Sequence, residues 1–197
     1  MKLHLNKELF NEAIRITAQQ MDIQPIYVEK DYWVTLVLHT LYHSAVKDEV
    51  IFKGGTSLSK CFGLIDRFSE DIDLVVLREE GDSGNKLTKK IKKISTLVSE
   101  LLPEVYLENI TQKMGMNRKT AHSYSKEFEG AYGQVRDVII VEATWLGYHE
   151  PYAKAKVSSY VYKMMLNNNQ ERIALEYGLQ PFEVLALDPK RTVCEKI

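Results

Sequence analysis

The stretch FKGGTSLSKCFGLIDRFSEDIDLVV, residues 52–76, places two carboxylates in an otherwise apolar segment. Asp71 and Asp73 are one residue apart, so a strand here would point both side chains to the same face of a sheet. A carboxylate removed from water costs several kcal/mol unless a cation or a hydrogen-bond donor compensates it. Neighbouring carboxylates are typical ligands of Mg²⁺, which completes its shell with water and phosphate oxygens. The pair therefore predicts a divalent-cation site.

The Gly-Gly-Thr-Ser segment that precedes the two carboxylates is suited to phosphate binding. Gly54 and Gly55 follow a short apolar strand candidate, and a predicted helix begins at Thr56, with Ser57 next. Glycine lets backbone N–H groups approach an anion closely, and the N-terminus of a helix favours negative charge. The segment matches neither a Walker A loop nor the G-x-G-x-x-G pattern. The order of strand, glycine pair, helix and Asp-x-Asp strand predicts a nucleoside triphosphate bound between amides and a metal ion.

A third carboxylate would complete two metal positions, and Glu142 is the best candidate because it lies in the apolar run VIIVEATWL. Asp137, just before that run, is a weaker candidate for the same role. Two simpler interpretations stay open. Glu142 would be a solvated, outward-facing residue on an edge strand. Gly54 and Gly55 would form only a tight turn, and Asp71 would cap a turn or pair with Arg67.

The periodicity of apolar residues predicts a mixture of helices and strands in one domain. Asn6 is a candidate N-cap of the first helix, and Thr192 with Glu195 forms a candidate capping box. The charged residues 29–31 begin the second helix, whose broad apolar face predicts core packing. Residues 157–166 fit a helix or a strand. Predicted helices cover residues 5–21, 26–44, 56–62 and 87–102; predicted strands cover residues 50–52, 72–77, 104–110, 123–128, 137–146 and 181–189.

Composition excludes several classes of protein. Lys and Arg total 26 and Asp and Glu total 27, so the formal charge of −1 gives no global basic field for nucleic acid or membrane. Cys61 and Cys194 are far apart and do not form a C-x-x-C pair, which argues against a disulfide framework and a cysteine zinc site. The N-terminus does not resemble a signal peptide, and no apolar run approaches the length of a membrane span. We therefore expect a soluble protein of a reducing cytoplasm.

Three segments resemble the AbiEii/AbiGii-type nucleotidyltransferases, which are the toxin members of bacterial abortive-infection and type IV toxin–antitoxin pairs. They are EKDYWVTLVL (residues 29–38), FKGGTSLSKCFGLIDRFSEDIDL (52–74) and PFEVLALDPKRTVCEKI (181–197). The resemblance implies an α+β fold, namely a polymerase-β-like nucleotidyltransferase core with a mixed sheet flanked by helices. We expect a single domain, 1–197, with an N-terminal helical segment (1–45), a catalytic core (46–190) and the start of a C-terminal helix (191–197). Because the family continues into a helical part, we also expect that such a part is missing after residue 197.

The resemblance also implies roles for individual residues. Asp71, Asp73 and Glu142 would bind Mg²⁺ or Mn²⁺, and Lys196 would act in catalysis by reaching the nucleotide. The expected nucleotide-binding residues are Gly54, Gly55, Thr56, Ser57, Arg67, Ser69, Thr192 and Glu195.

The reaction that the resemblance implies is transfer of a nucleoside monophosphate from an NTP to an acceptor hydroxyl, with release of pyrophosphate. RNA, in particular tRNA, is the acceptor class that it suggests, and an antitoxin protein is the expected partner. Residues 152–163, YAKAKVSSYVYK, interleave lysines with aromatic residues and are a candidate path for RNA, or else a solvated face. A small acceptor such as an aminoglycoside, or a non-catalytic nucleotide-binding module, remains the alternative.

Overall fold

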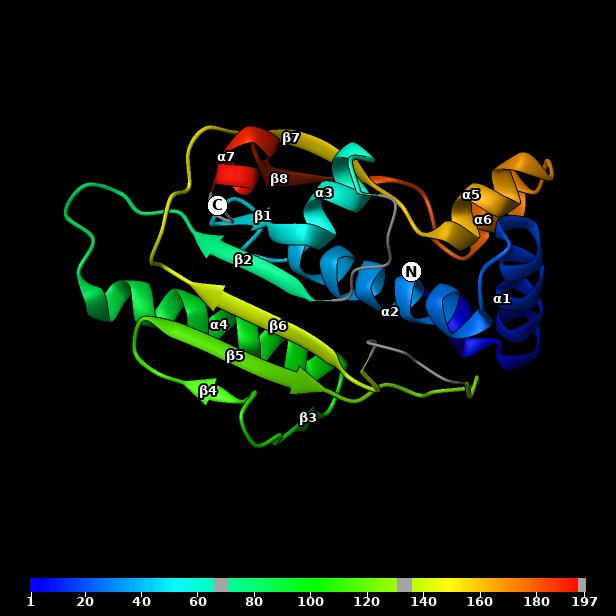
Figure 1. Cartoon of the computed structure of the whole chain (residues 1–197), viewed down its shortest axis with the longest axis horizontal. Helices are drawn as coiled ribbons and strands as arrows, with labels where there is room; N and C mark the ends of the chain where they lie inside the picture. Colours follow the sequence, from blue (N-terminus) through cyan, green and yellow to red (C-terminus); the bar gives the residue numbers. More distant parts are fainter. Residues whose placement is uncertain (66–70, 131–135, 195–197) are drawn as a thin grey trace.

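The computed structural model describes residues 1–65, 71–130 and 136–194 of the chain. These residues form a mixed sheet with helices on both faces (Figure 1). The strand order in the sheet is β3-β5-β6-β2-β1-β8-β7, and β4 pairs with β5 outside this path. The mixed sheet flanked by helices is the expected fold class.

The elements have the following bounds. The helices are η1 (Leu3–Leu5), α1 (Lys7–Met21), α2 (Pro25–Tyr42), α3 (Gly54–Phe62), α4 (Gly84–Leu101), α5 (Tyr160–Asn167), α6 (Glu171–Glu176) and α7 (Pro189–Cys194). The strands are β1 (Val50–Lys53), β2 (Ile72–Val76), β3 (Glu104–Val105), β4 (Gln112–Lys113), β5 (Asn117–His122), β6 (Ile139–Thr144), β7 (Tyr152–Val157) and β8 (Phe182–Leu187). Among the described residues, no helix is both long enough and apolar enough to cross a membrane.

Local chemistry explains where several helices begin. The side chain of Asn6 accepts a hydrogen bond from the Leu9 amide at the start of α1, which confirms the predicted N-cap. Ser83 caps α4 and Ser159 caps α5 in the same way. Pro25 occupies the first turn of α2, where its missing N–H costs nothing. These caps are short-range signals, so they can be recognised in the sequence.

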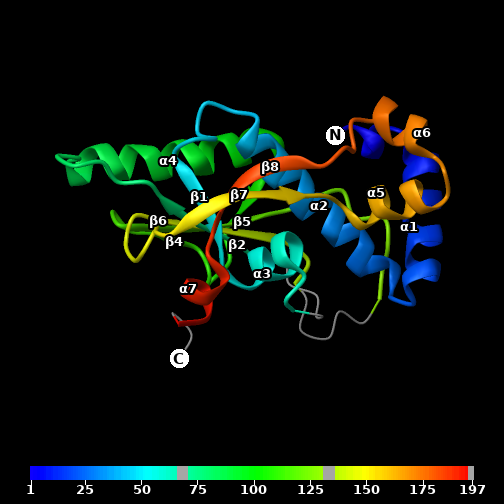
Figure 2. The same cartoon turned by 90° about the horizontal axis from the view of Figure 1, so that it is seen from above.

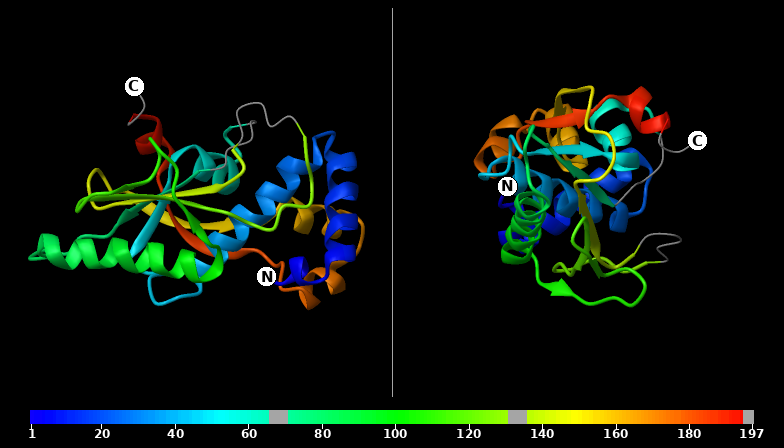
Figure 3. Two further views of the ribbon diagram at one scale, coloured as in Figure 1. Left: turned by 90° about the horizontal axis from the view of Figure 1, so that it is seen from below. Right: turned by 90° about the vertical axis from the view of Figure 1, so that its left-hand side faces the viewer.

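The helices divide into three groups. Helices α2 and α4 pack on one face of the sheet, whereas α3 and α7 lie on the other (Figure 2). Figure 3 shows the same separation from below, with α4 on one side of the strands and α7 beside the C-terminus on the other. Beyond the end of the sheet, helices α1 and α5 pack against α2, and α6 packs against α5. The face that carries α3 and α7 is therefore only partly covered.

The alternation of side chains along β2 places the Asp73 carboxylate on this partly covered face. Ile51, Val75 and Leu187 form a small buried cluster separate from the main core, while Leu74 belongs to the core on the α2 and α4 side. Asp73 and Val75 are two residues apart on β2 and thus point the same way. Asp73 therefore projects from the face on which α3 and α7 lie.

Two strand predictions were wrong. Residues 123–128 are not a strand; the sheet contains β5 immediately before them. These residues leave the sheet and run past α2, where the amides of Glu127 and Phe128 donate to the Glu29 carboxylate. The strand predicted over 104–110 ends after Val105, and Asn109 has a φ of 64°, a left-handed conformation that interrupts a strand.

The end of the described chain also differs from the prediction. Thr192 is not an N-cap, because it lies inside α7 and its hydroxyl donates to the Asp188 carbonyl at 3.4 Å. The Asp188 carboxylate accepts from the Lys190 amide at 2.8 Å, so Asp188 caps the helix instead. Residues 157–166 prove to be helical from Tyr160 onward, and β7, which we had not predicted as a strand, precedes them.

Candidate active site

Four charged side chains form a row across the neighbouring strands β1, β2, β6 and β5. Lys53 pairs with Asp73, Asp73 with Glu142, and Glu142 with Lys119. Directly paired residues point to the same face of a sheet, so the order of charges in the row is positive, negative, negative, positive. Asp71, just before β2, is two residues from Asp73 and extends the negative region. The row thus brings three carboxylates together on the partly covered face.

The row borders a cleft of about 250 Å³ that reaches from the sheet to α3 and α7. Residues from β1, α3, β2, β6 and α7 contribute to it, so segments distant in the sequence meet here. The cleft is lined by Lys53, Gly54, Asp73, Leu74, Glu142, Thr144 and Thr192.

The pKa of Asp73 is raised to about 6 in this environment. Burial is the largest cause, and repulsion by Glu142 and then by Asp71 adds to it. Lys119 and Lys53 lower this pKa but do not compensate fully. The negative charge at Asp73 is therefore poorly balanced, and a bound cation would stabilise it.

Glu142 is in a different electrostatic state from Asp73. Burial raises its pKa, but hydrogen bonds outweigh burial and the net pKa is lowered. The donors are the Lys119 ammonium at 2.9 Å from Oε2 and the Asn117 amide at 3.1 Å from Oε1. Because β6 lies between β5 and β2, the alternative in which Glu142 belongs to an edge strand is wrong.

Lys119 and Asn117 are site residues that the sequence did not reveal. Both lie on β5, which ends just before the strand that the sequence predicts over residues 123–128. Their spacing of two residues is the only signal that the sequence carries, and it becomes informative only when the pairing of β5 with β6 is known.

The residues fit a divalent cation held by two carboxylates. Asp71 Oδ1 is buried and has no hydrogen-bond partner in the described part of the chain, and its ion-pair contact is Arg136 Nη1 at 3.9 Å. Asp73 is destabilised by its acidic neighbours, as its pKa indicates. No three His, Cys, Asp or Glu side chains among the described residues already lie close enough to hold a metal ion. Asp71, with its unpartnered oxygen, and Asp73, with its poorly balanced charge, are the first candidate ligands, and Glu142, substrate oxygens or water would complete the shell.

Gly54 is required at its position for two independent reasons. Its φ of +80° is unfavourable for residues with a side chain. A β-carbon at Gly54 would lie 2.9 Å from Asp73 Cγ and would overlap Asp73 Oδ2. The helix α3 begins at this residue, so the glycine pair forms its first turn and not a separate turn before it.

The side chains of Thr56 and Ser57, which follow the glycine pair, form hydrogen bonds with backbone carbonyls. The Thr56 hydroxyl donates to the Asp71 carbonyl at 2.5 Å, and the Ser57 hydroxyl donates to the Phe52 carbonyl at 3.4 Å. Both side chains are buried and do not line the cleft. A phosphate at this turn would therefore contact backbone N–H groups of α3.

The remaining predicted site residues have different positions. Thr192 is buried and lines the cleft from α7, whereas Asp137 is largely exposed and pairs with Lys126 at 3.5 Å. Asp137 is therefore not part of the cleft. Four of the predicted residues lie outside the described part of the chain: Arg67, Ser69, Glu195 and Lys196.

Buried charged side chains at the start of α2 connect this helix to several other segments of the chain. Glu29, Lys30 and Asp31 are consecutive and almost fully buried, and each binds a different segment. Glu29 accepts from the amides of residues 127 and 128, and Lys30 donates to the carbonyls of residues 136 and 138. Asp31 binds Lys60 of α3 at 2.5 Å and the first amide of α5 at 2.8 Å. These charges hold α3, α5 and the segment before β6 against α2.

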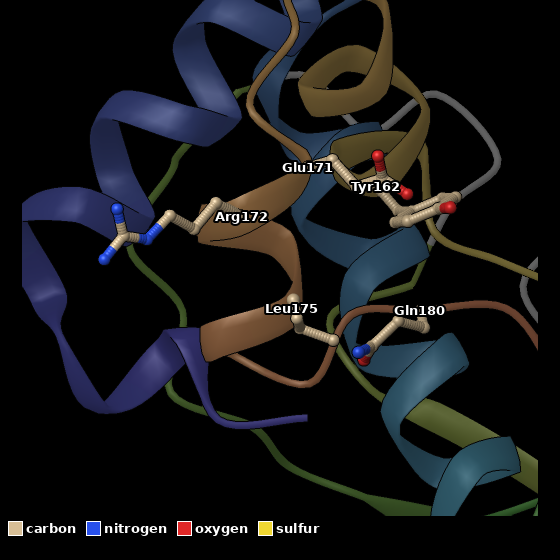
Figure 4. Close-up of a pocket in the computed structure, with 5 residues that line it drawn as sticks. All are labelled: Tyr162, Glu171, Arg172, Leu175 and Gln180. Atoms are coloured by element: carbon tan, nitrogen blue, oxygen red, sulfur yellow. The ribbon is translucent and has the colours of Figure 1, made fainter.

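A second hollow, of about 270 Å³, lies at α5 and α6 (Figure 4). In Figure 4, Arg172 points away from Tyr162 and Gln180, so the polar groups do not converge. Leu175 on this surface is mainly exposed. The hollow lacks the paired carboxylates of the cleft, and we assign the candidate active site to the cleft.

Gly54→Ala should destabilise the protein more than Gly63→Ala. Both glycines have positive φ, so alanine costs about 1–2 kcal/mol of backbone strain at each position. No atom lies within 4 Å of a β-carbon at Gly63, whereas at Gly54 the Asp73 carboxylate must also move. Urea denaturation of the two variants measures the difference. Equal losses of unfolding free energy would mean that the carboxylate does not constrain Gly54.

Comparisons with known proteins agree with this assignment. The sequence family described as nucleotidyl transferase AbiEii toxin, type IV TA system, matches residues 36–197. Among solved structures, the chain resembles MenT4, a nucleotidyltransferase toxin from Mycobacterium tuberculosis H37Rv, with a TM-score of 0.50 and 15% sequence identity. The match covers 93% of this chain and 57% of MenT4, so the chain spans little more than half the length of that protein. The search of curated proteins found no match.

The structural likeness shows a shared fold, and the family match covers the glycine turn, the Asp-x-Asp pair and Glu142. The charged cleft lies within the matched residues as well. The chain therefore belongs to the AbiEii family of nucleotidyltransferase toxins.

Proposed function

We propose that this protein transfers a nucleoside monophosphate from an NTP to a hydroxyl of RNA, with tRNA as the preferred acceptor class. The observation that carries the proposal is the pair Asp71 and Asp73 beside Gly54, where α3 begins. A triphosphate there would meet backbone N–H groups and the positive end of a helix on one side, and two carboxylates on the other. Membership of the AbiEii family supports the same chemistry.

In the proposed reaction, an acceptor hydroxyl oxygen attacks the α-phosphorus of the NTP. The bond from the α-phosphorus to the bridging oxygen breaks, pyrophosphate leaves, and the hydroxyl proton passes to solvent or to a nearby carboxylate. Asp71 and Asp73, with Glu142 as a third acid, would hold Mg²⁺ or Mn²⁺, which when bound neutralises phosphate charge and activates the attacking oxygen. The amides of Gly54 and Gly55 would bind phosphate oxygens, and Thr192 would close the cleft from α7.

Residues outside the described part of the chain complete the proposal. We assign Lys196 to the nucleotide, with Glu195 organising it, and Arg67 and Ser69 to the phosphates. Each of these roles follows from the family resemblance and is open to substitution experiments.

The edge strand β7 supports an RNA acceptor. Its exposed lysines, Lys154 and Lys156, are two residues apart and therefore point to the same face of the sheet. Lys154 pairs with Leu185 of β8. Leu185 packs with the small cluster on the site face, so these lysines share that face with Asp73. A backbone phosphate of RNA that follows β7 would meet positive charge on its way to the cleft. Lys154 also pairs with Glu183 at 3.1 Å, which moderates this charge.

The proposal is tested by incubating the purified protein with labelled NTPs, Mg²⁺ and total bacterial tRNA. We expect label to appear in tRNA, to disappear with EDTA, and to be absent with Asp71→Asn. Asp48→Asn is the matched control, because Asp48 is an exposed aspartate in the turn before β1. Label in an aminoglycoside but not in tRNA would assign a small acceptor. No transfer to either acceptor by the wild type, with NTP bound, would indicate a non-catalytic module.

The toxin role is a separate part of the proposal. We expect expression to arrest bacterial growth, and co-expression of a cognate antitoxin protein to restore it. Growth arrest of equal strength by an Asp71→Asn variant would exclude catalysis as its cause.

A further inference from the structure

We propose that Arg136 binds a phosphate of the nucleotide at this site, an inference that rests on the proposed nucleotidyl transfer. Arg136 lies three residues before β6, and its side chain is 49% exposed. Its Nη1 atom lies 3.9 Å from Asp71 Oδ1. This guanidinium is thus a solvent-accessible cation beside one of the two candidate metal ligands.

The contact between Arg136 and Asp71 is electrostatic and incomplete. A separation of 3.9 Å is too long for a hydrogen bond, and Asp71 Oδ1 is buried with no hydrogen-bond partner among the described residues. A buried carboxylate oxygen normally has such a partner. The Asp71 carboxylate is therefore attracted to Arg136 while remaining available for another ligand.

Binding of a divalent cation at Asp71 would change the surroundings of Arg136. The cation would repel the guanidinium and would also bring phosphate oxygens into its own shell. Because guanidinium groups bind phosphate through paired N–H donors, those oxygens are a suitable new partner for Arg136. The cation would then be the partner of Asp71, and the phosphate would bind Arg136.

The backbone at Arg136 is anchored although its side chain is exposed. The Lys30 ammonium, on the fully buried side chain of Lys30, donates to the carbonyls of Arg136 and Val138. Lys30 also lies 5.4 Å from the centre of the Tyr124 ring. A fixed backbone with an accessible side chain reduces the entropy lost when Arg136 binds a ligand. Lys30 therefore holds the backbone from which the Arg136 side chain extends.

The test measures binding of inorganic triphosphate with Mg²⁺ by titration calorimetry, without any acceptor. We expect Arg136→Gln to weaken this binding by roughly tenfold to a hundredfold, since it removes charge-assisted hydrogen bonds. Arg136→Lys should recover only part of the affinity, because lysine keeps the charge but lacks the planar donors. Arg172→Gln, a change of the same kind at an exposed position on α6, is the control and should bind as the wild type does.

A second measurement separates the nucleotide from RNA as the source of the phosphate. Total tRNA is titrated into the same variants without triphosphate. Arg136→Gln should leave tRNA binding within about twofold of the wild type, and in transfer assays it should raise the KM for NTP more than it lowers kcat. Weakened tRNA binding with unchanged triphosphate binding would overturn the nucleotide assignment. Unchanged binding of both ligands would overturn any phosphate role for Arg136.

These outcomes are distinct from failure of the proposed function. If the wild type binds no triphosphate and transfers no nucleotide, nucleotidyl transfer itself is wrong. If the wild type does both and Arg136→Gln is equally active and equally tight, only the role of Arg136 is wrong. Because the Arg136 side chain is half-exposed, its variants should unfold at the wild-type temperature, which circular dichroism verifies.

Discussion

Asp73→Asn should abolish nucleotide transfer and at the same time make the protein more stable at neutral pH. The carboxylate is a proposed metal ligand, so its loss should reduce transfer by at least about a hundredfold, the effect of removing one strong electrostatic contact in an active site. In the absence of metal, the same carboxylate is unfavourable because of burial and repulsion by Glu142 and Asp71. The uncharged amide removes that penalty.

The pH dependence of this stability difference follows from the raised pKa. Asp73 titrates at about 6 in the folded protein and near its ordinary value of 3.8 when unfolded. Below about pH 4 the Asp73 side chain is protonated in both the folded and the unfolded state. The stability that the folded protein gains from keeping this side chain neutral is then fully present. Between pH 4 and 6 the unfolded chain loses the proton first, so stability falls as pH rises through the folded pKa. Asp73→Asn does not titrate and does not lose this contribution.

The measurement is thermal unfolding of wild type and Asp73→Asn in EDTA from pH 4 to 8. The variant's advantage should grow between pH 4 and 6 and stay constant above, at about 1–3 kcal/mol, since one pKa unit corresponds to about 1.4 kcal/mol. Asp48→Asn should show no such pH-dependent advantage, because Asp48 is exposed. A variant that loses activity but is no more stable than wild type at pH 8 would contradict the electrostatic description of Asp73.

Asp31→Ala should have the largest effect on stability, a loss of about 3–5 kcal/mol, because it leaves a buried lysine without its counter-ion. The side chains of Asp31 and Lys60 are 3% and 6% exposed, and they are 2.5 Å apart. The Lys60 ammonium also contacts the Ser158 carbonyl at 3.3 Å and the Tyr160 ring, neither of which carries a charge. The substitution also removes the acceptor for the Tyr160 amide at the start of α5.

A double variant that lacks both charges tests this expectation by chemical denaturation. Asp31→Leu with Lys60→Met removes both charges and should recover much of the stability that Asp31→Ala loses. Glu183→Ala breaks the exposed pair with Lys154 and should leave the unfolding free energy almost unchanged. If the double variant is as unstable as Asp31→Ala, the loss comes from packing and not from an unpaired charge.

The fold was predicted well where the signals are local. The first two helices, β1, α3, β2 and α4 lie close to their predicted positions, because caps, a proline and apolar periodicity mark them. The errors fall in the second half of the chain, at residues 104–110, at β5, at β7 and at the start of α7. Strand β5 reads NRKTAH, and most of its stability comes from pairing with β6, so its own residues carry little strand signal.

The burial of the charges that begin α2 had no local signal either. Glu29, Lys30 and Asp31 lie in a helix whose remaining residues are mostly apolar, and the sequence indicates only that this helix is in the core. Which segment each charge binds depends on chain elements about 30 to 130 residues away. Such contacts follow from packing and not from periodicity.

The sequence by itself determined that a glycine pair links a strand to a helix, and that Asp71 and Asp73, two residues apart, point to one face of the sheet. Those facts depend on a two-residue period and on the conformational freedom of glycine, which are properties of neighbouring residues. Only the tertiary structure decided that Glu142 and Lys119 continue the row and that Arg136 meets Asp71. Strand order and register are set by long-range pairing and side-chain packing over the whole sheet, and no short stretch of sequence contains that information.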